Sequence, residues 1–230
     1  MILAIPILSF STCIIILRGD NYICVATDSK RTMTDPYTGK LMGTQQIEKV
    51  HAVGMIYFAV SGHDDAALTK YATLAITTTK DPIKAAKYFS DLMIAHYNDL
   101  MRLEQSLPKS DYQYYLHNAL GGVTFFGFRN EKPYMYMVEL IMKEIDGHPS
   151  VSATRDNDTP FMILGYRDHI QALSDIEFKA ILKKSPSNPL PACVELVQLE
   201  ISKHPDDIGC PIITLFLDSK QPHWGKAVCH

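Results

Sequence analysis

The sequence TCIIILRGDN, residues 12–21, predicts a β-strand that ends in a tight turn. The strand is expected over Cys13–Leu17, and Arg18-Gly19-Asp20-Asn21 has the composition of a hairpin turn. A second extended stretch follows and runs to Arg31. We therefore expect an antiparallel hairpin over 13–31, with Thr12 directly before its first strand.

The remaining segments follow in an order that is typical of an α+β protein. Strands are expected on both sides of a turn at 35–40, and at 53–61, 121–128, 133–142, 161–165 and 211–217. Helices are expected at 64–78, 81–103, 167–184 and 191–203. Two antiparallel sheets face to face, with a helix pair on each outer face, would bury these apolar runs in a four-layer αββα sandwich. We expect a single domain over 12–230, preceded by a leader at 1–11.

The leader has three interpretations. The first 17 residues carry no charged side chain, but Pro6 and the β-branched run Ile14–Ile16 weaken a membrane-spanning helix, so a membrane span is not favoured. A secretory signal would end at the small-residue pattern Ser9-x-Ser11, and a propeptide would be removed by the protein itself. Both place a cut directly before Thr12. A retained leader is a further alternative, and the compartment, cytoplasmic or exported, stays undecided.

The composition is that of a folded globular protein, with 230 residues of which 47% are hydrophobic and 20% charged. A formal charge of −3, without a long run of one sign, argues against nucleic acid as a partner. The nine histidines show no spacing such as His-Glu-x-x-His, and we expect neither a metal ion nor a cofactor. The five cysteines include no Cys-x-x-Cys pair; they are expected to be buried free thiols, although a disulfide is compatible with them.

Thr12 has the chemistry of a nucleophile if the chain is cut directly before it. A threonine hydroxyl needs a base to take its proton, and a new α-amine with a pKa of about 7.7–8.0 can be that base. Cys13 is a rival, because a thiolate is a better nucleophile than a hydroxyl. Strand alternation, however, places Cys13 on the opposite face from Thr12.

Four short motifs between Thr12 and Gly62 stand in a common register. They are Thr12 itself, Asp28 in Ala-Thr-Asp-Ser, Lys49 in Ile-Glu-Lys-Val, and Ser61-Gly62 at a strand end. With the order of the helices and the later Gly209-Cys210-Pro211, they make the chain resemble the proteasome β-subunit family of N-terminal nucleophile hydrolases. The resemblance covers Thr12 to Asp218. It implies the four-layer fold, peptide or amide hydrolysis, and assembly into a homo-oligomer such as a ring.

The resemblance also implies roles for individual residues. Thr12 would be the nucleophile, Asp28 its acidic partner and Lys49 the cation that lowers the pKa of the hydroxyl, while the Gly62 amide would stabilise an oxyanion. By position, the substrate pocket would be lined by Arg31, Ile47 and Val60, and the backbone of Thr32 would pair with an extended peptide. A pocket of this mixed apolar and basic kind would favour a large side chain, including an acidic one. The alternative is that Arg31 is a solvated charge of the hairpin.

The sequence departs from the family pattern at three places. The family has a Ser-Gly-Ser loop after the strand that corresponds to 161–165, where this chain has Gly165-Tyr166-Arg167-Asp168. Pro205 and Ile208 stand where the family has an aspartate and a serine, with Asp206 and Asp207 adjacent. Ser11 precedes Thr12, where self-processing members carry glycine.

Two other functions fit the same residues. A proteasome-fold protein that keeps its leader would be an inactive assembly or binding subunit, with Asp28 and Lys49 as a buried ion pair and Gly62 as a turn glycine. A cut one residue later would give a cysteine-nucleophile amidase that uses Cys13. His63, next to Gly62, is expected to be a helix-start residue rather than a catalytic one.

Overall fold

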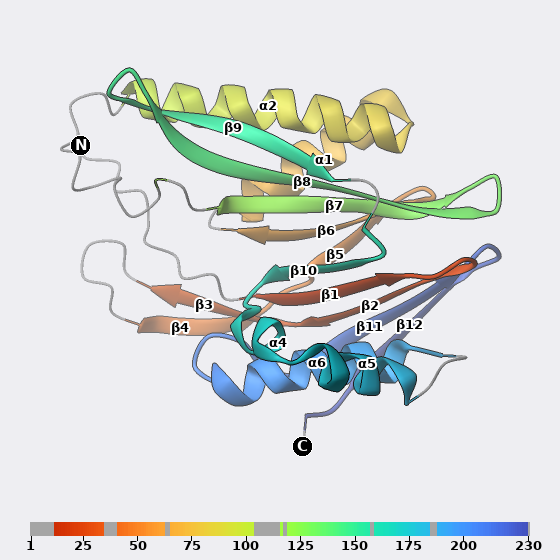
Figure 1. Ribbon diagram of the computed structural model, residues 1–230. Helices are drawn as coiled ribbons and strands as arrows, with labels where there is room; N and C mark the ends of the chain where they lie inside the picture. Colours follow the sequence, from red (N-terminus) through yellow and green to blue (C-terminus); the bar gives the residue numbers. More distant parts are fainter. Residues whose placement is uncertain are drawn as a thin grey trace.

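The computed structural model describes residues 12–34, 41–62, 65–103, 116, 119–156, 159–184 and 188–229. Within them the chain is an α+β protein with two five-stranded antiparallel sheets, a two-stranded sheet and five helices (Figure 1). The leader at 1–11, the turn at 35–40 and His63 lie outside the described residues.

The first sheet contains the predicted hairpin. Its strand order is β10-β1-β2-β11-β12, and all neighbours are antiparallel. The bounds are β1 Cys13–Arg18, β2 Tyr22–Asp28, β10 Phe161–Gly165, β11 Ile212–Asp218 and β12 Pro222–Ala227. Because β1 and β2 lie between strands from the second half of the chain, the first hairpin is held at the centre of this sheet.

The second sheet has the order β5-β6-β7-β8-β9, so that each strand pairs with its neighbour in sequence. Its strands are β5 Val50–Val53, β6 Ile56–Gly62, β7 Ala119–Arg129, β8 Lys132–Ile145 and β9 His148–Asp156. A separate hairpin, β3 Lys30–Thr34 with β4 Leu41–Gln46, leaves the end of β2 and leads toward β5.

The helices form two groups. Helices α1 Asp65–Thr79 and α2 Pro82–Leu103 pack against the second sheet, and α2 runs along β8 and β9 (Figure 1). Asp81 caps α2, because its carboxylate accepts a hydrogen bond from the Lys84 N–H at 3.0 Å. Helix α6 Leu190–Lys203 packs on β1, β2 and β11 of the first sheet, and the shorter α4 Asp168–Ala172 and α5 Asp175–Lys183 pack on α6.

Three apolar clusters hold these elements together. One lies between the second sheet and helices α1 and α2, and another lies between the first sheet and helices α4, α5 and α6. The remaining cluster is shared by the two sheets and joins residues such as Ile14 and Ile16 of β1 to Tyr57 and Phe126. Cys13 and Ile15 belong instead to the helix-side cluster, so β1 is covered on both faces.

Most of the predicted elements are confirmed, but the strand expected at 53–61 begins later than predicted, at Ile56. Gly54 and Met55 form a turn that separates β5 from β6. Gly54 has φ of 62°, a conformation that glycine adopts without steric cost. The apolar run therefore contains the end of one strand and the whole of the next.

Two strands were not expected, and one segment that was predicted as a single helix forms two helices. Strands β9 and β12 each stand at a sheet edge, and β12 is almost wholly exposed, so their sequences lack the apolar pattern of a buried strand. The helix predicted at 167–184 is divided at Leu173-Ser174. Ser174 caps α5 in a reciprocal arrangement with Glu177, which starts a new helix there.

A search of the helices in the described part of the chain found none with the length and apolar character needed to cross a membrane.

Candidate active site

Thr12 lies at the start of β1 and is held by its main chain. It is 8% exposed, and its carbonyl accepts a hydrogen bond from the Tyr166 N–H at 2.7 Å. The next N–H, that of Cys13, donates to Asp28 Oδ1 at 2.8 Å. The N-terminal end of β1 is therefore fixed on one side by Tyr166, which follows β10, and on the other by Asp28, the last residue of β2.

Asp28 is fully buried and collects hydrogen bonds from several segments. Its Oδ2 accepts from the N–H groups of Lys30 at 3.1 Å and Gly209 at 3.4 Å, in addition to the Cys13 N–H on Oδ1. Burial raises the pKa of the Asp28 carboxyl, while the Lys49 ammonium and the N–H groups of Cys13 and Gly209 act in the opposite direction. The carboxylate thus joins the Thr12 end of β1 to residues from three other parts of the chain.

Lys49 is the counter-ion of Asp28. Its Nζ donates to Asp28 Oδ1 at 2.8 Å, to Oδ2 at 2.9 Å and to the Lys30 carbonyl at 2.8 Å, which uses the three donors of an ammonium. The side chain is almost completely buried. The Lys49 carbonyl accepts from the Val60 N–H at 3.0 Å and so ties the segment before β5 to β6.

Gly62 ends β6 opposite Gly121 of β7. A Cβ on Gly62 would lie 2.6 Å from the Gly121 Cα and 2.9 Å from the Leu120 carbonyl oxygen, so the two backbones approach too closely for any side chain. This accounts for glycine at both positions. The predicted role of the Gly62 N–H in binding an oxyanion stays a prediction.

Gly165 and Tyr166, which in the sequence are only a difference from the family's loop, contact Thr12 in the structure. A Cβ on Gly165 would collide with the Thr12 carbonyl, and Gly165 has φ of 82°. Glycine here lets β10 approach Thr12, and the following N–H then makes the hydrogen bond described above. The Tyr166 hydroxyl donates to Asp207 Oδ2 at 2.7 Å, which gives one of the two adjacent aspartates a structural contact.

The residues predicted to bind substrate are found in different environments. Thr32 is buried, and its hydroxyl donates to the Asp206 carbonyl at 3.1 Å. Arg31 is half-buried on β3, and Val60 is buried in the cluster beneath α1 and α2. Ile47 donates its N–H to the Ser29 carbonyl at 2.9 Å. Their roles toward a substrate stay predictions.

A cavity of about 930 Å³ lies beside Lys49, on the side where Ile47 is found. Its lining comes mostly from the 46–53 segment, from residues 211 and 213, and from residues 224–226, with Ser29, Phe58 and Thr73 completing it. Ile47 and Lys49 are the predicted site residues among those that line it, and Thr12 is not part of this lining. The cavity therefore neighbours the Asp28–Lys49 pair without opening onto Thr12.

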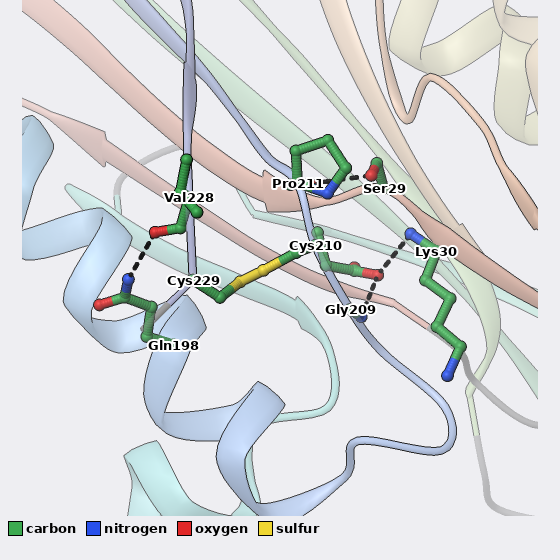
Figure 2. The surroundings of a disulfide bond; sticks show 9 residues. Ser29, Lys30, Gln198, Gly209, Cys210, Pro211, Val228 and Cys229 are labelled. Atoms are coloured by element: carbon green, nitrogen blue, oxygen red, sulfur yellow. Dashed lines mark hydrogen bonds between the residues drawn. A yellow bond between two sulfur atoms is a disulfide. The ribbon is translucent and has the colours of Figure 1, made fainter.

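A disulfide between Cys210 and Cys229 borders the site (Figure 2). It joins the segment before β11 to the residues after β12, and the adjacent Pro211 carbonyl accepts from the Ser29 hydroxyl at 2.8 Å. Gly209, whose N–H reaches Asp28, directly precedes the bridge. The expectation of free thiols is therefore wrong for this pair, because the pairing of β11 with β12 brings the two cysteines together.

Comparison of the chain with models of protein families and with curated proteins gave no match. Among the described residues, a buried carboxylate accepts a hydrogen bond from the N–H that follows Thr12, and a buried ammonium is paired with that carboxylate.

The other three cysteines, Cys13, Cys24 and Cys193, are buried free thiols, as expected. Burial raises the pKa of the Cys13 thiol well above its usual value, with Asp28 and Glu200 adding to the effect, and burial raises the pKa of Cys193 to about 12. Because the thiolate is the reactive form, these groups stay protonated and unreactive near neutral pH.

We expect Ellman's reagent to find no accessible thiol in the native protein at mildly alkaline pH. After denaturation without reductant it should find the three free cysteines, and after reduction all five. Five thiols before reduction would contradict the Cys210–Cys229 bridge. Rapid reaction in the native state, traced to Cys13 by peptide mapping, would contradict its burial.

Proposed function

We propose that the protein is a threonine-type N-terminal nucleophile hydrolase, which cleaves peptide or amide bonds once Thr12 is exposed by removal of residues 1–11. The observation that supports this most directly is the Asp28 carboxylate, which binds the Lys49 ammonium at 2.8 Å and the Cys13 N–H at 2.8 Å. The Lys49 cation is thereby linked, through the Asp28 carboxylate, to the N–H of the residue that follows the proposed nucleophile. Burying such an ion pair costs desolvation energy. A catalytic site that needs a fixed positive charge would account for its presence here.

The proposed reaction is acyl transfer. The Thr12 hydroxyl attacks the substrate carbonyl while the free α-amine, directly or through a water, takes its proton. The proton then passes to the leaving amine, an acyl-enzyme forms, and water hydrolyses it. Lys49 lowers the pKa of the hydroxyl and disfavours protonation of the amine by like charge. The Gly62 N–H stabilises the oxyanion, a contribution that is worth about 10²–10³ in rate in comparable sites.

The resemblance to proteasome β-subunits is part of the same proposal. It includes a four-layer αββα arrangement, a single domain over 12–230 and assembly into a homo-oligomer such as a ring. The cluster shared by the two sheets supports the face-to-face arrangement, and the helix contacts on each sheet support the outer layers. Arg31, Ile47, Val60 and the Thr32 backbone would then serve substrate binding.

Two observations favour the inactive alternative. Thr12 is only 8% exposed, and all three ammonium donors of Lys49 are used within the protein, as a purely structural ion pair would have them. In that case the leader stays attached and the protein is an assembly or binding subunit. The amidase that uses Cys13 has less support, because the Cys13 side chain is fully buried in the cluster beneath α6.

The intact mass and N-terminal sequence of the mature protein test the proposal. We expect a chain that begins at Thr12, because only this cut gives the hydroxyl an adjacent α-amine. A mature chain that begins at Met1 contradicts the proposed function and supports the inactive subunit. A chain that begins at Cys13 transfers the chemistry to the thiol.

A further inference from the structure

Three metal-binding side chains from two helices meet below the first sheet. His169 lies on α4, Glu200 lies on α6, and His204 is the residue that ends α6. One ligand atom from each lies within 4.8 Å of the others. Glu200 and His204 share a helix face because they are four residues apart, and the packing of α4 on α6 adds His169.

Glu200 supplies the decisive observation, because half of its buried carboxylate has no hydrogen-bond partner. The residue is 0% exposed, and its Oε1 accepts from the Ile170 N–H at 2.8 Å. Among the described residues, neither Glu200 Oε2 nor His204 Nε2 has a hydrogen-bond partner. An unsatisfied carboxylate oxygen in the interior is costly, and buried charges are normally paired or bound to metal.

The two unsatisfied atoms face each other at a distance that suits a bridging ion better than a direct contact. Glu200 Oε2 and His204 Nε2 are 3.9 Å apart. A charge-assisted hydrogen bond between them would be about 2.7–2.9 Å long. Two ligands on one tetrahedral zinc ion, each at about 2.1 Å, are about 3.4 Å apart. Small side-chain rotations would shorten the distance between Glu200 Oε2 and His204 Nε2 from 3.9 Å to that value.

The His204 ring is also held in place from outside the trio. The Tyr166 ring stacks on it with a centroid distance of 4.3 Å, and the Tyr166 hydroxyl is fixed by Asp207. The His169 ring lies 5.2 Å from that of His204. These ring contacts restrict the orientation of the His204 imidazole. The Ile170 N–H fixes the other oxygen of Glu200, as outer hydrogen bonds do for carboxylate ligands of metals.

We propose that His169, Glu200 and His204 bind a divalent transition-metal ion, with Zn²⁺ as the best match. Two imidazoles and one carboxylate suit zinc, whereas Mg²⁺ and Ca²⁺ prefer sites made of oxygen alone. The His204 side chain is 24% exposed, although its Nε2 is buried, so the ion would lie just beneath the surface. The site is separate from Thr12 and independent of the proposed hydrolase function.

The ion would strengthen the same region that holds Thr12. Tyr166 stacks on His204 and donates its N–H to the Thr12 carbonyl, so a metal that fixes His204 also fixes the loop after β10. We therefore assign the ion a structural role between α4, α6 and this loop.

The test is a titration of the untagged, full-length protein with Zn²⁺ after removal of bound metal with a chelator. Calorimetry should show one ion per chain, and Co²⁺ in its place should give the visible absorption of a tetrahedral nitrogen and oxygen site. Replacement of a ligand, as in His169→Gln or His204→Gln, should weaken Zn²⁺ binding at least about tenfold. His223→Gln is the matched control, because His223 lies beside Asp218 at 3.6 Å and outside the trio; it should bind Zn²⁺ as the wild type does.

Thermal unfolding of the wild type provides a readout that needs no variant. Zn²⁺ should raise the melting temperature, a chelator should reverse the rise, and Mg²⁺ at the same concentration should leave it unchanged. No bound Zn²⁺ in the wild type overturns the proposal. So does binding that both histidine variants retain at wild-type affinity, or a Mg²⁺ response equal to that of Zn²⁺.

Discussion

Thr12→Ala is expected to abolish hydrolysis without disturbing the fold. Alanine has no hydroxyl to attack the carbonyl, so the rate on fluorogenic peptides should fall at least about 10³-fold. The contacts that hold this position, through the Thr12 carbonyl and the Cys13 N–H, are made by the main chain and survive the change. Circular dichroism and thermal unfolding should therefore match the wild type.

Two further variants complete this experiment. Thr12→Ser keeps a hydroxyl and should retain measurable activity, while Thr77→Ala, on the exposed surface of α1, should have full activity. The mass of the Thr12→Ala protein also separates two origins of the cut. A retained leader indicates that Thr12 cleaves its own chain, whereas a removed leader indicates a separate protease. Hydrolysis that persists in Thr12→Ala would refute the assignment of the nucleophile.

Lys49→Met is expected to cause the largest loss of stability of any single change at the site. It removes the ammonium and leaves the Asp28 carboxylate buried with only backbone donors around it. Breaking a buried ion pair in this way costs about 3–5 kcal/mol of unfolding free energy. Chemical denaturation measures the effect, and loss of activity should accompany it.

A surface pair gives the matched control. Lys184 Nζ contacts Glu195 Oε1 at 2.6 Å, yet the two side chains are 59% and 40% exposed. Lys184→Met should therefore cost less than about 1 kcal/mol. The double variant Asp28→Asn with Lys49→Met should be less destabilised than the sum of its single changes, because neither charge is left alone. Equal losses for Lys49→Met and Lys184→Met would contradict the importance of burial.

The Lys49→Met defect should depend on pH. Burial already raises the pKa of Asp28, and loss of the ammonium removes the main opposing influence. The native carboxyl then binds its proton more tightly than the unfolded one, so stability falls as the pH rises through the interval between the unfolded and folded pKa. The variant should thus be closer to the wild type in mild acid than at neutral pH.

The fold could be predicted from the sequence wherever an element is buried. The isoleucine run of β1, the Asp81-Pro82 start of α2 and the apolar strand β10 all carry their own signals. Strand β12 carries none, because it is formed by pairing with β11 at an exposed edge. The break between α4 and α5 depends on a capping serine inside an otherwise continuous helical pattern.

The candidate site could be predicted in part. Asp28 and Lys49 were expected to be partners, and they form a buried ion pair. The contribution of Gly165 could not be predicted, since it depends on how closely β10 passes the Thr12 carbonyl. The proximity of the three side chains of the proposed metal site could not be predicted for a similar reason. His169 is far in sequence from Glu200 and His204, and a histidine four residues after a glutamate is common on helices without any ion.

The hydrogen bonds at the start of β1 have a consequence for maturation. Those that the structure shows are made by the carbonyl of Thr12 and the N–H of Cys13, and both groups lie on the carboxyl side of the Ser11–Thr12 peptide bond. Cleavage of that bond breaks neither of them. In the proposed maturation, the new amine would therefore form next to two hydrogen bonds that already hold the start of β1 in register.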